Sequence, residues 1–194
     1  MKLEEAEKYA KQVTDAISSL CEKTLVVGSV RRRRPEVNDI DVVAIPDYSD
    51  YRIPDPLHNT TQITRMKPDE TWKKNILKVV FEKLHASVVK AGPELITVTL
   101  PHQAGSSIPF GVRYANVQVD IYRATPKTWG VLTLIRTGSK EHNIKLCSRA
   151  KGMGLMLSAK DGVVYEGRVI ASETEEDIFK ALGMDYVPPE KREL

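Results

Sequence analysis

Two aspartates interrupt an apolar stretch of strand-forming residues in the first quarter of the chain. Asp39 and Asp41 flank Ile40, and the apolar run continues to Ile45. Successive side chains of a β-strand point to opposite faces, so residues two apart share a face. The segment is therefore expected to be a strand that projects both carboxylates from one face. A solvated strand end is the simpler interpretation of such a pair when it is taken alone.

A second predicted strand, at residues 117–122, carries a third carboxylate. Apolar residues occupy every second position from Val117 to Ile121, so Asp120 points away from the buried face. Mg²⁺ prefers carboxylate oxygens, phosphate and water, and a two-metal site needs carboxylates that bridge ions roughly 3.5 to 4 Å apart. With Asp120 as the third ligand, the sequence predicts a site for two Mg²⁺ ions, for which Mn²⁺ can substitute.

A glycine-serine pair and a basic run stand between the first predicted strand, residues 24–27, and the two aspartates. Gly28 allows backbone to approach a phosphate closely, and Ser29 adds a hydroxyl beside exposed N–H groups. The basic run, Arg31 to Arg34, supplies guanidinium groups that bind phosphate bidentately. An ordinary turn followed by a solvated basic loop is the alternative when each feature is taken alone.

The remaining pattern indicates an α+β organisation with a helical C-terminal part. Apolar spacing and capping signals predict helices, and a further β-branched run predicts a strand. The predicted helices are 3–22, 69–84, 128–135, 140–150 and 173–182, the additional strand is 94–100, and long irregular segments are expected at 46–68 and 101–109. The character of the sequence changes beyond Pro126, so the expected domains are 1–127 and 128–194.

Composition limits the classes of partner. Lys and Arg outnumber Asp and Glu by only 29 to 26, a net charge of +3, so phosphate binding has to come from local patches rather than bulk charge. The two cysteines, Cys21 and Cys147, form no CxxC pair, which argues against a zinc site or a disulfide framework. Neither a signal peptide nor a membrane-spanning run is visible, and a cytoplasmic protein without membrane partners is expected.

Several motifs in chain order resemble family X DNA polymerases, the DNA polymerase beta-like nucleotidyltransferases. The three-carboxylate signature of that superfamily matches Gly28–Arg32, Asn38–Asp41 and Val119–Ile121. The segment Thr137–Asn143 is similar to the thumb motif of family X. Residues 174–178, 182–183 and 188–190 resemble the end of the same thumb, so the likeness covers nearly the whole chain as palm plus thumb.

The resemblance implies a fold, a reaction and roles for individual residues. The fold is a palm with a mixed or antiparallel sheet and flanking helices, plus a small, mostly helical thumb. The reaction is two-metal nucleotidyl transfer from a nucleoside triphosphate to a primer 3′ hydroxyl. It is expected to be distributive short-gap or repair synthesis by a monomer on a DNA primer-template. The catalytic and metal-binding residues are Asp39, Asp41 and Asp120, and the nucleotide-binding residues are Gly28, Ser29, Arg32, Asn38, Thr137, Gly138 and Asn143.

Three positions depart from the family pattern. Ile135-Arg136 replaces the aromatic pair that usually precedes the thumb Thr-Gly, and Cys147 stands where an Arg often contacts the template. Tyr122 stands where polymerase beta-like enzymes carry an Arg that pairs with a catalytic Asp. Sugar choice, fidelity and the closing switch are therefore not transferred from the family.

Three cations of a predicted thumb helix, Lys140, Lys145 and Arg149, are candidates for contacts to DNA phosphates, although such a run is commonly a solvated face. Two other functions stay open. A nucleotidyltransferase with the same palm chemistry could act without a template on a small molecule, an RNA end or a protein. A non-catalytic DNA-binding remnant is the third possibility, which the intact set of aspartates disfavours.

Overall fold

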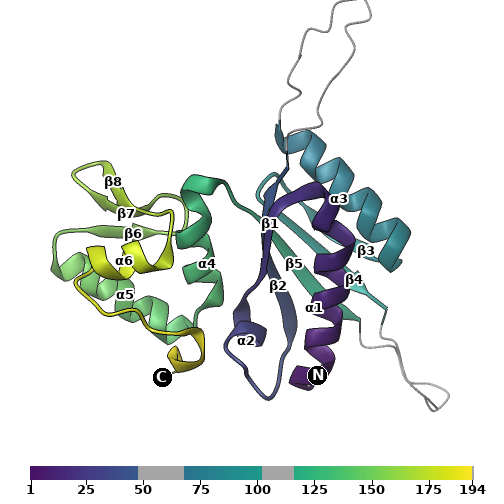
Figure 1. Ribbon diagram of the computed structural model, residues 1–194, viewed down its shortest axis with the longest axis horizontal. Coiled ribbons are helices and arrows are strands. Elements are labelled where there is room, and N and C mark those ends of the chain that lie inside the picture. The colour runs from purple at the N-terminus through teal and green to yellow at the C-terminus, as the bar shows by residue number, and fades with distance from the viewer. Residues whose placement is uncertain (48–67, 102–115, 194) are drawn as a thin grey trace, which may run out of the picture.

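The computed structural model describes residues 1–47, 68–101 and 116–193, which form two sheets and their flanking helices (Figure 1). The strands are β1 (Cys21–Val26), β2 (Asp39–Pro46), β3 (Ser87–Ala91), β4 (Leu95–Leu100), β5 (Val117–Arg123), β6 (Met156–Ser158), β7 (Gly162–Tyr165) and β8 (Arg168–Ala171). The α-helices are α1 (Leu3–Ile17), α2 (Gly28–Arg31), α3 (Pro68–Leu84), α4 (Trp129–Thr137), α5 (Lys140–Gly152) and α6 (Glu175–Ala181). Three short 3₁₀ helices are η1 (Ser18–Leu20), η2 (Pro126–Thr128) and η3 (Pro189–Lys191).

The larger sheet is mixed and has the strand order β1-β2-β5-β4-β3. Strands β2 and β5 run parallel to each other, while the other neighbouring strands are antiparallel. The two central strands therefore point the same way and bring their N-terminal ends to one edge of the sheet. This arrangement confirms the α+β prediction with a mixed sheet.

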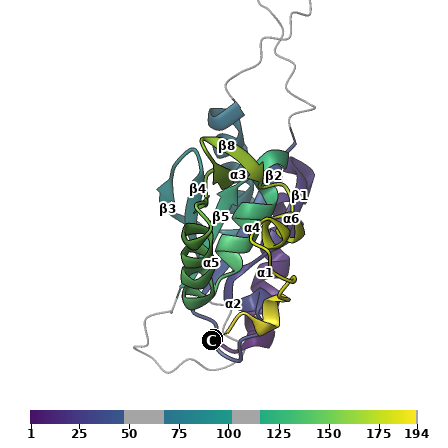
Figure 2. The ribbon, with the colours of Figure 1, turned by 90° about the vertical axis from the view of Figure 1, so that its left-hand side faces the viewer.

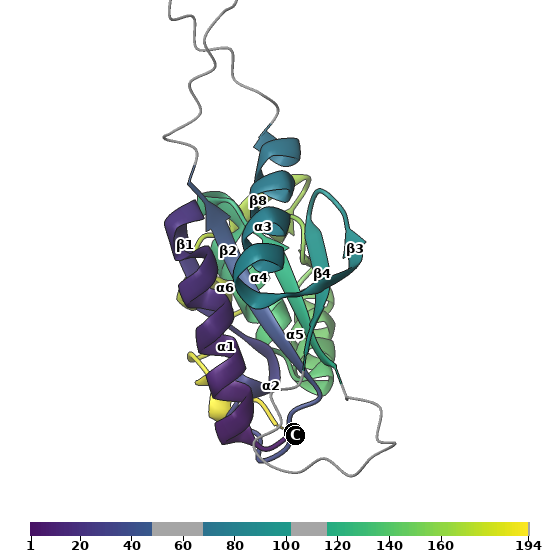
Figure 3. The same ribbon diagram turned by 90° about the vertical axis from the view of Figure 1, so that its right-hand side faces the viewer.

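One face of the larger sheet is covered by α1 and α3, which lie next to each other across it (Figure 3). The apolar residues of α1 recur at helical spacing, and their side chains are buried against the alternate apolar residues of the strands. Trp72 of α3 is 1% exposed and belongs to the same core. On β2 the residues that face this core are Ile40, Val42 and Ala44.

The opposite face of the larger sheet packs on α4. Val43 and Ile45 of β2 join Tyr122 of β5 in a second apolar cluster, against which Trp129 and Leu132 of α4 pack. Because strand residues alternate between faces, Asp39, Asp41 and Asp120 point to this same side. The fold thus directs the carboxylates towards the C-terminal part of the chain.

Helix α4 also forms part of the core of the C-terminal part, residues 128–193 (Figure 2). Its Val131 and Leu134 are fully buried with Leu146 of α5 and with Ile178 and Phe179 of α6. The three-stranded sheet β6-β7-β8 completes this core through Val163 and Ala171. At Gly130 an added Cβ would overlap the backbone of Thr174, so glycine is required where α4 meets the segment before α6.

Several elements differ from the sequence prediction. The sheet β6–β8 and strand β3 were not predicted, because their strands are only three to five residues long and β3 is mostly exposed. The pair Gly28-Ser29, predicted to be a turn, begins the short helix α2. The predicted irregular segments at 46–68 and 101–109 fall largely outside the described residues. None of the helices in the described ranges combines the length and apolarity needed to cross a bilayer.

Candidate active site

The three predicted carboxylates lie side by side on the two parallel central strands. Asp41 is the direct register partner of Asp120, and Asp39 is paired with Gln118 two residues earlier. Their side chains are half-buried and share the face that looks towards α4. The structure therefore brings together the three aspartates that the sequence singled out, from segments about 80 residues apart.

The carboxyl group of Asp41 has a raised pKa. Burial, followed by the charges of Asp39 and Asp120, raises its pKa from 3.8 to about 7. The hydroxyl of Tyr122 donates to Asp120 Oδ2 at 3.3 Å, and the other oxygen, Oδ1, is buried without a hydrogen-bond partner. A half-buried set of like charges with an unsatisfied oxygen is suited to a cation.

Gly28 lies directly against Asp41. It adopts φ +63°, and an added Cβ would overlap Asp41 Oδ2. Both its backbone conformation and this close approach require glycine. The glycine that the sequence suggested for phosphate binding also leaves room for the carboxylate of Asp41.

Replacing Gly28 with Ala is expected to reduce nucleotide incorporation by roughly 100-fold, because the new Cβ displaces Asp41 and small misplacements of reacting groups are this costly. Primer extension at saturating nucleotide measures the loss. Gly154 also has a positive φ, +72°, but no atom lies within 4 Å of an added Cβ. Gly154→Ala introduces the same backbone strain away from the site and should keep near-wild-type extension; an equal loss in both variants would contradict the steric argument.

A polar cavity of about 420 Å³ opens beside the carboxylates. Its lining includes four of the predicted nucleotide-binding residues, Gly28, Ser29, Arg32 and Asn38, together with Asp39 and Asp41. Ser29 Oγ is buried and has no hydrogen-bond partner among the described residues. A hydroxyl in that state, beside a guanidinium group, is suited to a phosphate oxygen.

A second cavity of about 570 Å³ adjoins the first and is more apolar. Its lining includes Gly138 and Asn143, as predicted for the sugar and base, and also Ile135, Ile144 and Cys147. Asn143 donates from Nδ2 to the carbonyl of Ile135 at 2.8 Å, which fixes its orientation. The two cavities share part of their lining, namely Arg32, Arg136, Ser139 and Lys140.

Thr137, the remaining predicted nucleotide-binding residue, lines neither cavity. Its side chain is fully buried, and its hydroxyl accepts a hydrogen bond from Arg31 at 2.7 Å. Its carbonyl accepts from Arg32. Thr137 therefore positions Arg31 and Arg32 at the C-terminal end of α2.

Arg136 and Tyr122, two of the departures from the family pattern, lie together at the site. The guanidinium carbon of Arg136 lies 4.1 Å from the centre of the Tyr122 ring. The positive charge of Arg136 partly offsets the rise in the Asp41 pKa that burial and the neighbouring carboxylates cause. This pair could not be predicted from the sequence, because Tyr122 stands on β5 and Arg136 on α4.

A buried ionic network joins α2 to the end of the chain. Arg31 binds Glu175 through two hydrogen bonds of 2.9 and 2.7 Å, and Arg192 binds the same carboxylate at 2.8 Å. Arg192 is fully buried and also lies over the rings of Phe179 and Tyr186. Burial alone would raise the pKa of Glu175, but hydrogen bonds from the two arginines hold it below its ordinary value.

The sequence did not reveal this network. Glu175 stands in the first turn of α6 with two more acids, where acidic residues are common for reasons of helix polarity alone. The partners Arg31 and Glu175 are 144 positions apart. No local pattern can predict such a contact; only the tertiary fold brings the two side chains together.

One of the three residues predicted to contact DNA, Arg149, already makes hydrogen bonds within the protein. Lys140, Lys145 and Arg149 are all exposed on α5. The guanidinium of Arg149 donates to the carbonyls of Leu182 and Gly183, so it caps the end of α6. DNA contact by the three residues stays a prediction.

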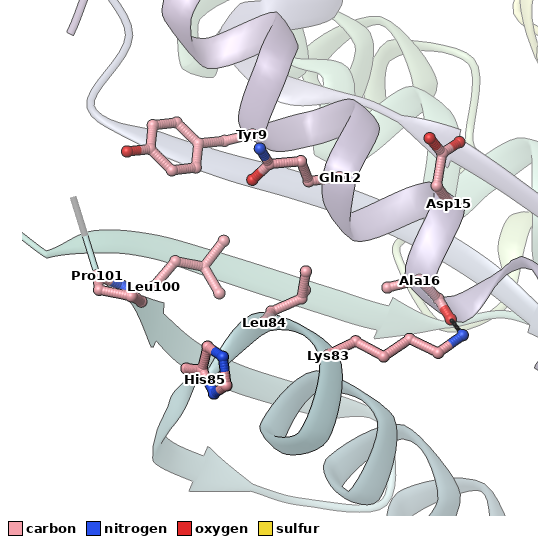
Figure 4. Close-up of a pocket in the computed structure, with 9 residues that line it drawn as sticks. All are labelled: Tyr9, Gln12, Asp15, Ala16, Lys83, Leu84, His85, Leu100 and Pro101. Atoms are coloured by element: carbon pink, nitrogen blue, oxygen red, sulfur yellow. Dashed lines mark hydrogen bonds between the residues drawn. The ribbon is translucent and has the colours of Figure 1, made fainter. Parts of the chain in front are cut away.

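A separate cavity of about 470 Å³ lies between α1, α3 and the end of β4 (Figure 4). Lys83 Nζ donates to the carbonyl of Ala16 across it, at 3.5 Å. Leu100, which lines this cavity, belongs to the core under α1 and α3. The cavity therefore lies on the face of the sheet opposite the three aspartates.

The thumb segment matches a known family in sequence. Residues 132–193 match the model of the DNA polymerase beta thumb. Over 191 residues the chain is 26% identical to the DNA polymerase/3′-5′ exonuclease PolX of Bacillus subtilis (strain 168). The match covers 97% of this chain and 26% of that protein, so the chain spans about a quarter of the length of this curated relative.

Solved structures match the fold over the whole chain. Two crystal structures of Leishmania infantum polymerase beta, described as a ternary P/T complex and a ternary gap complex, superpose with TM-scores of 0.72 and 0.74. Each is 18% identical, and the match covers all of this chain and 77% and 71% of those chains, respectively. The similarity predicted from the sequence motifs is confirmed.

Proposed function

We propose that this chain is a DNA-directed DNA polymerase of family X type, which adds nucleotides to a primer 3′ hydroxyl. The observation that carries the proposal is that Asp41, the register partner of Asp120, lines one cavity together with Ser29 and Arg32. The proposal divides the chain into a palm, residues 1–127, and a thumb, residues 128–194.

The two cavities are proposed to bind different parts of the nucleoside triphosphate. Ser29 and Arg32 bind the triphosphate in the polar cavity, where the unpartnered Ser29 hydroxyl can donate to a phosphate oxygen. Gly138 and Asn143 pack against the sugar and base in the adjoining cavity. Asp120 is proposed to accept the proton of the primer hydroxyl as the hydroxyl oxygen attacks the α-phosphate and pyrophosphate leaves.

Asp39, Asp41 and Asp120 would hold two Mg²⁺ ions. Within the described ranges, no group of three or more His, Cys, Asp or Glu side chains already has the geometry of a metal site. The support is chemical: three carboxylates share one face, Asp41 is destabilised as an anion, and Asp120 Oδ1 lacks a partner. When bound, the two ions supply activation of the hydroxyl and neutralisation of the triphosphate charge.

The proposal extends to the acceptor and to the mode of synthesis. Exposed Lys140 and Lys145 on α5 are proposed to contact phosphates of the primer-template. With a net charge of only +3, the chain should release DNA often, which favours distributive synthesis in short gaps. The proposed enzyme acts as a monomer in a cytoplasmic, reducing setting, consistent with Cys21 and Cys147 both being free thiols.

Primer extension with single nucleotides tests the function. A labelled primer is annealed to four templates that differ in the templating base, with and without a downstream strand that leaves a one-nucleotide gap, and each deoxynucleotide is supplied separately with Mg²⁺. Incorporation only of the complementary nucleotide is expected, and EDTA should abolish it. Addition that ignores the template would instead indicate a template-independent nucleotidyltransferase, and DNA binding without incorporation would indicate a non-catalytic protein.

A further inference from the structure

The penultimate residue of the chain lies in the proposed phosphate cavity. Glu193 lines the same cavity as Ser29 and Asp41. Its Oε1 accepts a hydrogen bond from Arg32 Nε, and its other oxygen, Oε2, lies 3.7 Å from Arg34 Nη1. A carboxylate of the protein therefore contacts the cation that is proposed to receive the triphosphate.

The edge of the Arg32 guanidinium that includes Nε is occupied by Glu193. Its Nε donates to Glu193 and its Nη1 donates to the carbonyl of Thr137. Because Nε carries a single N–H, a bidentate contact through Nε and a neighbouring Nη requires Glu193 to leave. The carbonyl of Thr137 belongs to the backbone at the end of α4, whereas Glu193 contributes only a side chain that is 31% exposed.

The backbone next to Glu193 is fixed, so only its side chain has to move. The carbonyl of Arg192 accepts a hydrogen bond from Ser139 Oγ at 2.7 Å, and the buried Arg192 side chain binds Glu175. Arg34, which is half-exposed, lies close enough to keep the carboxylate after it leaves Arg32. Rotation of one side chain between two cations would open the phosphate contact.

On the basis of the proposed function, we infer that Glu193 occupies the triphosphate's place on Arg32 and leaves it when a polyphosphate binds. The carboxylate keeps Arg32 charge-paired in the absence of nucleotide. It also adds a negative charge where a triphosphate brings several more. Each binding event thus includes breaking one charge-assisted hydrogen bond, which lowers the apparent affinity for nucleotides.

Binding of inorganic tripolyphosphate, without metal or DNA, tests the inference by calorimetric titration. Glu193→Gln keeps the shape but removes the charge, and it should bind tripolyphosphate about five- to tenfold more tightly than the wild type. Glu190→Gln, at an exposed residue of η3, removes the same charge nearby and should bind as the wild type does. In an Arg32→Gln background, Glu193→Gln should bring no gain. Equal or weaker binding by Glu193→Gln overturns the inference.

A second measurement uses the unaltered protein. The Nε–H resonance of Arg32, assigned by its loss in Arg32→Lys, should shift on addition of tripolyphosphate because its acceptor changes from carboxylate to phosphate. A resonance that stays in place while tripolyphosphate saturates the protein overturns the inference. The outcome is separate from that of the proposed function: tighter binding by Glu193→Gln can occur in a protein that extends no primer, and a template-directed polymerase can lack the Glu193 effect.

Discussion

Substituting Asn for Asp120 is expected to reduce the proposed primer extension by about 10³-fold or more, because the loss of one carboxylate from the proposed two-metal site removes several kcal/mol of transition-state stabilisation. Asp120 is the register partner of Asp41 and has one oxygen with no partner. Asparagine keeps the shape of the side chain but supplies only a neutral oxygen. Single-turnover extension with Mg²⁺ at saturating nucleotide measures the chemical step.

The fold should survive this substitution. The charge of Asp120 is one of the causes that raise the pKa of Asp41, so its removal relieves repulsion inside the site and should not lower the melting temperature. Asp185→Asn, at an exposed position of the C-terminal part, is the matched control and should extend primers as the wild type does. Extension by Asp120→Asn within a few fold of the wild type would exclude the assignment of this residue.

The second large effect is expected in stability. Replacing Glu175 with Gln leaves Arg31 and the fully buried Arg192 without a counter-ion, which costs about 3–5 kcal/mol when one partner of a buried ion pair is removed. Urea unfolding at pH 7 measures the loss. Glu176→Gln, the exposed neighbour on the same helix, should change the free energy of unfolding by less than about 0.5 kcal/mol.

The pH dependence gives an independent check on the same contact. The folded-state pKa of Glu175 lies below its ordinary value of 4.5, so the unfolded state takes up the proton first as the pH falls. The stabilisation is present above pH 4.5 and is lost as the pH falls from there through the lower, folded-state pKa. The difference in stability between wild type and Glu175→Gln should therefore shrink below pH 4.5. A difference that stays constant down to the acid transition would show that the charge of Glu175 contributes nothing.

Most of the residues that meet at the candidate site could be predicted, because local patterns in the sequence indicate them. Alternation along two strands assigned Asp39, Asp41 and Asp120 to one face, and the parallel register of β2 and β5 then brings them together. Gly28 was recognised as a position of close backbone approach, although the atom it approaches, Asp41 Oδ2, was not foreseen. The spacing of apolar residues, every second position in a strand and every third or fourth in a helix, is enough to predict which side chains share a face.

The parts that could not be predicted depend on contacts between distant segments. Arg32 was assigned to phosphate, but its partners Glu193 and the carbonyl of Thr137 are more than 100 positions away. The pair formed by Arg136 and Tyr122 joins a helix to a strand of another part of the chain. Such contacts produce no periodic pattern in the sequence. Arg136 and Tyr122 could therefore be recognised only as departures from the family pattern.

The double role of α4 restricts how proteins with this fold can be recombined. Trp129 and Leu132 pack on the larger sheet, while Val131 and Leu134 fill the core of the C-terminal part. A chimera that joins a foreign thumb directly after Thr137 would keep the first contact and break the second, whereas a junction before Pro126 would do the reverse. In a working hybrid, one face of α4 has to match the sheet of the first protein and the other face has to match the C-terminal part of the second. A protein engineer therefore has to redesign α4 itself and not only the junction.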